Sequence, residues 1–233
     1  MNMKKTELPK LFVVIDDSDE EGALKKWEKI EEVEGDFGLK LNLDLVLKDP
    51  TISSRFKEKS GKKIFADMKT WNGKRTMAVI MQMLADNGAD MTNVYAHAGD
   101  MLEKAIKIAN DNDITVLGVT VLTHYTDAYC RRLYDKSIGE AVRVLAEMAL
   151  ENGCHGIILP GTTLSNVADI KCIKFNPATR PNWSNDLKAN FQKQIMDHSE
   201  ALASGADIVS CGSPIFKSPD PAAALRRILS EIN

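Results

Sequence analysis

The chain has 233 residues, of which 44% are hydrophobic and 27% are charged, and its formal net charge is −3. This balance is typical of a globular protein with a sizeable core, and the slightly acidic charge argues against general nucleic-acid binding. No apolar run approaches the ~18 residues that a membrane helix needs, and residues 1–10 lack the apolar stretch of a signal peptide.

Short β-rich runs alternate with helical or polar stretches along the chain. The eight predicted strands are residues 11–16, 37–43, 63–69, 92–97, 114–120, 155–160, 170–175 and 206–212. The amphipathic helix patterns are clearest at residues 20–32, 74–87, 100–112, 138–152 and 221–232. Several helices stop at a glycine that leads into the next strand, because glycine accepts the left-handed conformation that ends a helix. The sequence therefore predicts a chain of βα units.

Strict βα alternation implies parallel strands with right-handed crossovers. Eight such units in 233 residues match a (β/α)8 TIM barrel, which typically needs ~250 residues. A doubly wound open sheet is the competing interpretation, but its G-x-G-x-x-G turn after the first strand is absent, and Asp-Asp-Ser-Asp stands at residues 16–19. Because we find no linker or low-complexity segment, we predict an α/β fold with a single barrel domain over residues 1–233.

Charged residues in the strands are informative, because a parallel barrel strand is covered on both faces. Leucines occupy every second position from residue 39 to residue 47, so they share one face of the predicted second strand. Lys40 and Asn42 then point the other way, and if the leucines meet the helices, Lys40 points into the barrel. The alternative for Lys40 is a solvated position at a frayed strand end.

The third strand favours a functional site. Asp67 and Lys69 are two residues apart, so they share a face and lie ~6.6 Å apart along the strand. Asp16 ends the first strand in the same way. Three strands thus carry an ionisable group near their carboxyl ends, where barrel enzymes build their sites. Since buried charges are a weak route to stability, this clustering favours function over a structural salt-bridge cluster.

The segments that contain these residues resemble, in chain order, the motifs of the orotidine 5′-phosphate decarboxylase family. Residues 67–76 (DMKTWNGKRT) resemble its D-x-K-x-x-D…T motif. The other similar segments are residues 14–16 (VID, for A-L-D), Lys40, residues 119–123 (VTVLT), residues 176–181 (NPATRP, for P-G-I-R-P), Gln192 and residues 212–215 (GSPI, for G-R-P-I). Each similarity alone is weak, but the collinear set spans most of the chain and is specific.

The resemblance implies a chemistry. Family members decarboxylate orotidine monophosphate to UMP, a step of pyrimidine nucleotide biosynthesis, without a metal or organic cofactor. By this resemblance Asp67 faces the departing carboxylate, and Lys69 stabilises the developing carbanion and donates a proton to carbon. Lys40 keeps Asp67 ionised and oriented, because an opposite charge at hydrogen-bond range favours the charged form. The implied activity is that of a carboxy-lyase.

The resemblance also implies the contacts that bind the nucleotide. Asp16 is expected to hydrogen-bond the ribose, and Thr123 is expected to contact the base. The segment through Asn72 and Thr76 is expected to reach the site of a neighbouring subunit, because family members are dimers with sites at the interface. The residues expected around the phosphate are Arg180, Gln192, Gly212 and Ser213.

Two positions depart from the family pattern. Asn72 stands where the family has the second aspartate of its Lys–Asp–Lys–Asp tetrad, so the array gains one net positive charge. This charge favours the ground-state carboxylate of the substrate, and we therefore expect weaker decarboxylation than with the full tetrad. Ser213 stands where the family has a phosphate-binding arginine and supplies no charge. The lysines that could compensate are Lys188, Lys193 and Lys217.

Two other functions remain open on the sequence alone. Related sugar-phosphate decarboxylases and aldolases share the third-strand motif, but they bind magnesium through a second-strand glutamate, where this chain has Lys40 and Asn42. A catalytically weak barrel that only binds a nucleotide is the other alternative. The expected partners are a small nucleotide and a second copy of the chain, without nucleic acid or membrane.

The cysteines bear on the location of the protein. They are Cys130, Cys154, Cys172 and Cys211, and they lie far apart without the spacing of metal ligands. We interpret them as reduced thiols, mostly buried, in a cytoplasmic protein that holds no structural metal.

Overall fold

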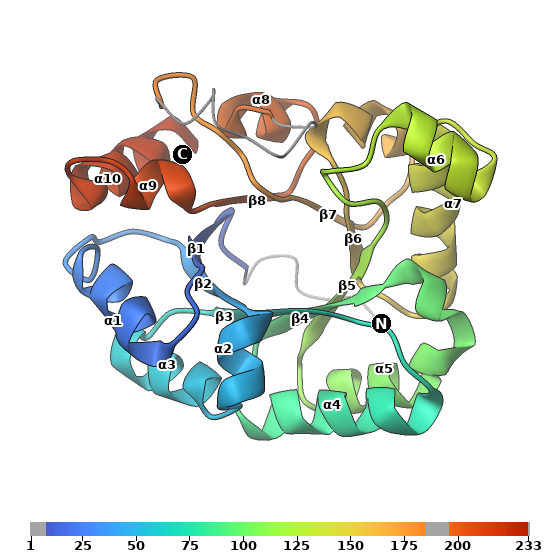
Figure 1. Ribbon diagram of the computed structural model, residues 1–233, viewed down its shortest axis with the longest axis horizontal. Helices are drawn as coiled ribbons and strands as arrows, with labels where there is room; N and C mark the ends of the chain where they lie inside the picture. The colour runs from blue at the N-terminus through green and yellow to red at the C-terminus, as the bar shows by residue number, and fades with distance from the viewer. Residues whose placement is uncertain (1–7, 185–195, 233) are drawn as a thin grey trace.

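The computed structural model describes residues 8–184 and 196–232. Eight parallel strands pair in chain order, and the eighth pairs with the first, so the sheet is a closed barrel (Figure 1). The strands are β1 (Leu11–Ile15), β2 (Gly38–Asn42), β3 (Ile64–Thr70), β4 (Met91–Tyr95), β5 (Thr115–Val119), β6 (Gly156–Ile158), β7 (Ile173–Asn176) and β8 (Ile208–Cys211). The (β/α)8 barrel is therefore confirmed, and each predicted strand overlaps an observed one.

Helices form a ring outside the strands (Figure 1). They are α1 (Glu20–Glu28), α2 (Leu43–Lys48), α3 (Ile52–Ser60), α4 (Lys74–Asp86), α5 (Glu103–Asp111), α6 (Asp127–Tyr134), α7 (Ile138–Glu151), α8 (His198–Ala203), α9 (Ser213–Phe216) and α10 (Pro221–Ile232), with 3-10 turns η2 (Ala96–Leu102) and η3 (Gly161–Val167). Local signals set their ends, as where Ser137 and Glu140 form a capping box at the start of α7. Among the described residues, no helix combines the length and apolar character that crossing a bilayer requires.

The second strand is shorter than the leucine pattern predicts. β2 ends at Asn42, and α2 begins at Leu43, so the leucines beyond residue 42 lie on a helix and the predicted common face is wrong there. Leu39 and Leu41 alone cover the outer face of β2, and both are fully buried. The alternation of leucines continues into α2, because a short apolar run is compatible with the period of a strand and with that of a helix. The inward direction of Lys40 is unaffected.

The core has an outer and an inner part. The outer part packs between strands and helices, whereas the inner part fills the barrel. The rings of Phe12, Phe65 and Phe175 lie inside, with centroids 5.3 to 6.1 Å apart. Gly38, beside Phe12 on the neighbouring strand, leaves room for that ring, because a Cβ there would lie 2.4 Å from it. The three rings close the interior and form a floor beneath the carboxyl ends of the strands.

Candidate active site

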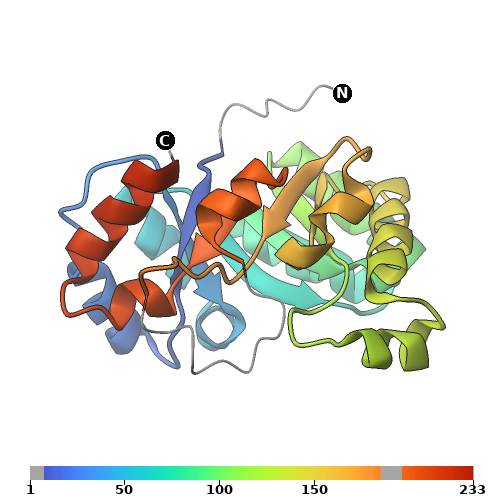
Figure 2. The same cartoon turned by 90° about the horizontal axis from the view of Figure 1, so that it is seen from above.

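A pocket of about 580 Å³ opens at the carboxyl ends of the strands, above the phenylalanine floor. Figure 2 shows α2 and α6, which follow the carboxyl ends of β2 and β5, at this same end of the barrel. The sequence-predicted residues that line the pocket are Asp16, Lys40, Asp67, Lys69, Thr123, Arg180, Gly212 and Ser213. Asn72 and Thr76 are not among its lining residues, and Gln192 lies outside the described residues.

The strand period explains why charged groups meet here. Alternate residues face the inside of the barrel, so β1 presents Phe12, then Val14, and finally Asp16 at the mouth. On β3 the same succession runs from Phe65 to Asp67 and then to Lys69. On these two strands a phenylalanine of the floor thus lies below an ionisable residue at the mouth, and the predicted clustering of these groups is present in the structure.

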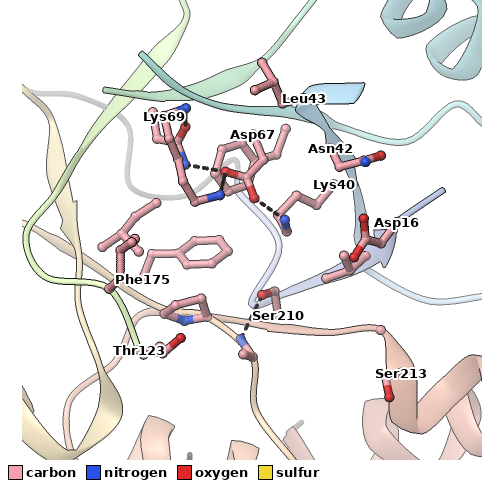
Figure 3. Close-up of a pocket in the computed structure, with 18 of the residues that line it drawn as sticks. Asp16, Lys40, Asn42, Leu43, Asp67, Lys69, Thr123, Phe175, Ser210 and Ser213 are labelled. Carbon is pink, nitrogen blue, oxygen red and sulfur yellow. Dashed lines mark hydrogen bonds and ion pairs between the residues drawn. The ribbon is translucent and has the colours of Figure 1, made fainter. Parts of the chain in front are cut away.

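Asp67 lies between two lysines (Figure 3). One carboxylate oxygen, Oδ2, accepts from Lys40 Nζ, and the other, Oδ1, accepts from Lys69 Nζ. The side chains of Lys40 and Asp67 are only 11% and 8% exposed, whereas that of Lys69 is 40% exposed. Lys40 therefore does not lie on a solvated strand end, and Lys69 is the member of the array most open to a bound molecule.

The charges of the array set its protonation state. Burial alone raises the pKa of Asp67, but the positive charges of Lys40 and Lys69 outweigh it and hold that pKa well below its ordinary value. Asp67 is therefore ionised at neutral pH. Burial lowers the pKa of Lys69, and Lys40 adds to this effect while Asp67 opposes it. Lys69 is thus a better proton donor than an exposed lysine.

The backbone at Lys69 is unusual. Its φ is 46°, in the left-handed region that costs a non-glycine residue about 1–3 kcal/mol. The pairing of β3 with β4 shifts register between Ala66 and Thr70, so an irregularity in the ladder surrounds this residue. The side chain of Asn93 on β4 accepts the Lys69 N–H and donates to Asp67. Asn93 was not predicted from the sequence as a site residue, although it is a polar residue within a predicted buried strand.

The opposite side of the pocket is built by the segments that follow β7 and β8. Arg180 is buried, and its guanidinium donates to the carbonyls of Ala178 and Thr179 at 3.4 and 3.1 Å. Gly212 packs closely on β1, where a Cβ would lie 2.7 Å from the Val14 side chain and 3.1 Å from its carbonyl oxygen. A larger residue at position 212 would therefore push β8 away from β1, which explains why this wall needs glycine.

Ser210 is a second lining residue that sequence analysis did not select. It is fully buried on β8, and its hydroxyl accepts from the Ala178 N–H at 3.3 Å. Its carbonyl accepts from the N–H and the hydroxyl of Thr179. Ala178 has a φ of 59°, so these bonds hold a strained turn that carries Arg180 to the pocket. The signal for Ser210 in the sequence is a polar residue within an otherwise apolar strand.

Asn72 and Thr76 lie apart from the pocket of their own chain. Asn72 is exposed, and its side-chain oxygen accepts from the N–H of Gly73 at 2.8 Å, just before α4 begins. Thr76 lies in the first turn of α4. The pocket of one chain thus contains Lys40, Asp67 and Lys69 without the fourth member of the expected tetrad.

The donor set does not fit a magnesium ion. Magnesium prefers oxygen ligands in octahedral arrangement, and the pocket offers the carboxylates of Asp16 and Asp67. Both oxygens of Asp67 are already paired with lysines, and the second strand supplies an ammonium group and an amide. Within residues 8–184 and 196–232, no three His, Cys, Asp or Glu side chains are grouped as metal ligands would be.

Comparisons with solved structures agree with the fold. The structure of orotidine 5′-phosphate decarboxylase from Lactobacillus acidophilus superposes with a TM-score of 0.79 at 24% identity, over 97% of this chain and 99% of that one. An uncharacterized conserved protein from Geobacillus kaustophilus superposes with a TM-score of 0.77 at 20% identity, over 96% and 100% of the two chains. At these identities the likeness shows the barrel alone.

The sequence relatives go further. An orotidine 5′-phosphate decarboxylase from Nautilia profundicola is 29% identical over 229 residues, which are 96% of this chain and 98% of the relative. One from Caulobacter sp. is 30% identical over 197 residues, 83% of this chain and 84% of the relative. Both names describe carboxy-lyases, which is the enzyme class of the chain. The model of the orotidine 5′-phosphate decarboxylase / HUMPS family matches residues 9–228, and the chain therefore belongs to this family.

Proposed function

We propose that the protein decarboxylates orotidine 5′-phosphate to UMP, in pyrimidine nucleotide biosynthesis, without a metal or organic cofactor. The observation that carries the proposal is the ionised Asp67, buried between Lys40 and Lys69 in the pocket at the carboxyl ends of the strands. The names of the relatives support the same reaction. The pocket needs no redox group for this reaction, because a proton replaces carbon dioxide on the ring and no electrons enter or leave overall.

The reaction breaks the bond between carbon 6 of the pyrimidine ring and its carboxylate. Carbon dioxide leaves, and the electron pair of the broken bond stays on the ring carbon. The ammonium group of Lys69 stabilises this charge and then transfers a proton to the same carbon, which completes UMP. Fixed charges aimed at a developing carbanion act strongly in a site from which water is excluded. Asp67 opposes the substrate carboxylate, and this repulsion is relieved as carbon dioxide departs.

The remaining lining residues bind the nucleotide in this proposal. Asp16 binds the ribose, Thr123 contacts the base, and Arg180 with Gly212 and Ser213 surrounds the phosphate. Their positions around one pocket support this assignment. Gln192, Lys188 and Lys193 lie outside the described residues and remain predictions. Of the three lysines expected to replace the missing arginine charge, Lys217 lines the pocket and is our choice.

We further propose that the enzyme is a cytoplasmic homodimer with shared active sites, acting on a free nucleotide. The support is the position of Asn72, which is exposed, is not among the lining residues of its own pocket and follows Trp71, which is 59% exposed. A neighbouring copy that covers Trp71 would receive Asn72 and Thr76 at its own site. Sedimentation of the active enzyme tests this arrangement, and full activity in a monomer would contradict it.

A direct assay tests the reaction. Purified protein is incubated with orotidine 5′-phosphate, with and without EDTA, and UMP binding is measured by calorimetry. We expect turnover that EDTA does not change. The kcat should be lower than that of a family member with aspartate at the position of Asn72. Binding of UMP without turnover would contradict the proposal and favour a barrel that only binds nucleotides. Turnover of a sugar phosphate that stops with EDTA would favour the magnesium-dependent alternative.

A further inference from the structure

Asn93 is a neutral polar residue in the interior of the barrel. It lies in the middle of β4, is 1% exposed, and borders the pocket. A buried amide is costly unless its donors and acceptors are paired, so its partners indicate why it is there. Within the part of the chain that the structure describes, both of its side-chain hydrogen bonds lead to the charge array.

The amide of Asn93 joins Asp67 to the backbone of Lys69. Its Oδ1 accepts from the Lys69 N–H at 2.6 Å, and its Nδ2 donates to Asp67 Oδ1 at 2.7 Å. The orientation of the amide follows from chemistry, because an N–H cannot accept and an ionised carboxylate cannot donate. The reverse orientation would turn two acceptors toward each other at Asp67 and two donors toward each other at Lys69.

The irregular ladder explains why an amide is needed. Where β3 and β4 lose register between Ala66 and Thr70, the Lys69 N–H is met by a side chain of β4. Lys69 also holds its left-handed φ of 46° at this point. The side-chain oxygen of Asn93 therefore pairs this backbone donor and stabilises the conformation that sends Lys69 Nζ back toward Asp67.

From these contacts we infer that Asn93 is a positioning residue for the Asp67–Lys69 pair, an inference that rests on the proposed function. Asp67 Oδ1 accepts from both Lys69 Nζ and Asn93. When Lys69 turns its ammonium group to the substrate carbon, the bond from Asn93 remains and keeps Asp67 ionised and in place. Asn93 thus acts on the reaction through its two partners and does not touch the reacting atoms.

The neighbouring Thr92 provides a matched control. It is equally buried on the same strand, and its hydroxyl donates to the Ala66 carbonyl at 2.9 Å. It faces the helices and does not line the pocket. Thr92→Val and Asn93→Leu each keep the branching of the side chain and remove hydrogen bonds that β4 makes, but only Asn93→Leu removes bonds to the charge array.

Kinetics of the two variants test the inference. We expect Asn93→Leu to lower kcat about 100-fold with KM within about threefold of the wild type, because the reacting groups are misplaced while substrate binding persists. Thr92→Val is expected to change kcat by less than about twofold. Equal losses of kcat in the two variants, or an unchanged kcat in Asn93→Leu, would show that Asn93 only stabilises the fold.

Asn93→Asp gives a second measurement if Asn93→Leu does not fold. This isosteric change keeps an acceptor for the Lys69 N–H but sets a carboxylate against Asp67, so the acidic limb of the kcat–pH profile should move upward. Should the wild type not decarboxylate orotidine 5′-phosphate, NMR of the Lys69 ε-carbon, assigned with Lys69→Arg, still reports on the array. The added charge should raise the pKa of Lys69 in Asn93→Asp but not in Thr92→Val, and an unchanged pKa would overturn the inference.

Discussion

At each end of the barrel an aspartate lies between two lysines. At the amino end, Asp90 precedes β4, and its Oδ1 pairs with Lys57 Nζ at 2.9 Å and with Lys63 Nζ at 3.1 Å. At the carboxyl end, Asp67 pairs with its two lysines in the pocket. The two carboxylates are nearly equally buried, at 11% and 8% exposure. Residue types and burial alone therefore do not distinguish the two clusters.

The partners and the surrounding space do distinguish them. The second oxygen of Asp90 accepts from the Ile64 N–H at 2.9 Å, and Lys57 also donates to the Gly88 carbonyl. These bonds tie the starts of β3 and β4 to α3. Asp67 instead pairs with side chains that all line the pocket, and this cavity can admit a ligand. A charge cluster is a candidate site when its charges face a cavity and are not taken up by the backbone.

Removing one lysine from each cluster should give the largest contrast. We expect Lys69→Ala to lower kcat for orotidine 5′-phosphate by about 1,000-fold or more, because the charge that stabilises the carbanion and the proton it receives are both lost. Lys63→Ala should leave kcat within about twofold of the wild type, since its half-exposed ion pair lies at the far end of the barrel. Steady-state kinetics of both variants measure the contrast, and equal losses would refute it.

The aspartate at the amino end should matter for stability. Asp90→Asn weakens two ion pairs and a charge-assisted hydrogen bond from the Ile64 N–H, so we expect the free energy of unfolding to fall by about 1–3 kcal/mol. Asp169→Asn, which breaks an exposed pair with Arg143, should lower the free energy of unfolding much less than Asp90→Asn does, because solvent screens a surface ion pair. Urea denaturation measures both, and a loss of activity in folded Asp90→Asn would contradict the division between the clusters.

The cluster at the carboxyl end could be predicted from the sequence, whereas the cluster at the amino end could not. The βα alternation indicates the closed barrel, and the two-residue period brings Lys40, Asp67 and Lys69 to one mouth because that period is a property of any strand. Asp90 was not recognised as a counterpart, since its lysines come from α3 and from the start of β3. Such pairing depends on tertiary contacts that no local pattern records.

The missed pocket residues have a different cause. Asn93 and Ser210 carry no charge, so a search for ionisable residues in apolar strands passes over them. Both are nevertheless buried polar groups that hold a residue in a left-handed conformation, Lys69 in one case and Ala178 in the other. Such strain arises at the ladder irregularity in β3 and in the turn after β7, and it is invisible in a sequence read by periodicity alone. Neutral polar residues in buried strands should therefore be searched together with charged ones.

Restoring an acidic residue at position 72 should sharpen the role of the carboxyl-end cluster. If the sites are shared between subunits, Asn72→Asp adds a negative charge near Lys69 of a neighbouring copy and offsets the excess positive charge of the array. We expect kcat to rise about tenfold, which corresponds to about 1.4 kcal/mol of transition-state stabilisation. Kinetics of this variant beside Asn87→Asp, the same exchange just beyond the other end of α4, measure the effect. An unchanged kcat would undermine the assignment of Asn72 to the tetrad.

The smallest expected effect concerns a histidine at the amino end, where pH should alter stability and not chemistry. His155 Nδ1 accepts from the Val116 N–H at 2.8 Å, so the neutral ring carries its proton on Nε2, which lies 2.8 Å from Asn110 Oδ1. Burial lowers the pKa of His155 below its ordinary value. Because the folded state favours the neutral ring, this contribution to stability is complete above the unfolded pKa of about 6.5 and is lost as the pH falls below it.

We expect the urea midpoint to decrease between about pH 7.5 and pH 5 more steeply in the wild type than in His155→Gln, which lacks the titrating ring. Parallel midpoints in the two proteins would refute the role of His155, whereas Lys69→Ala should keep the wild-type slope because its cluster lies at the other end of the barrel.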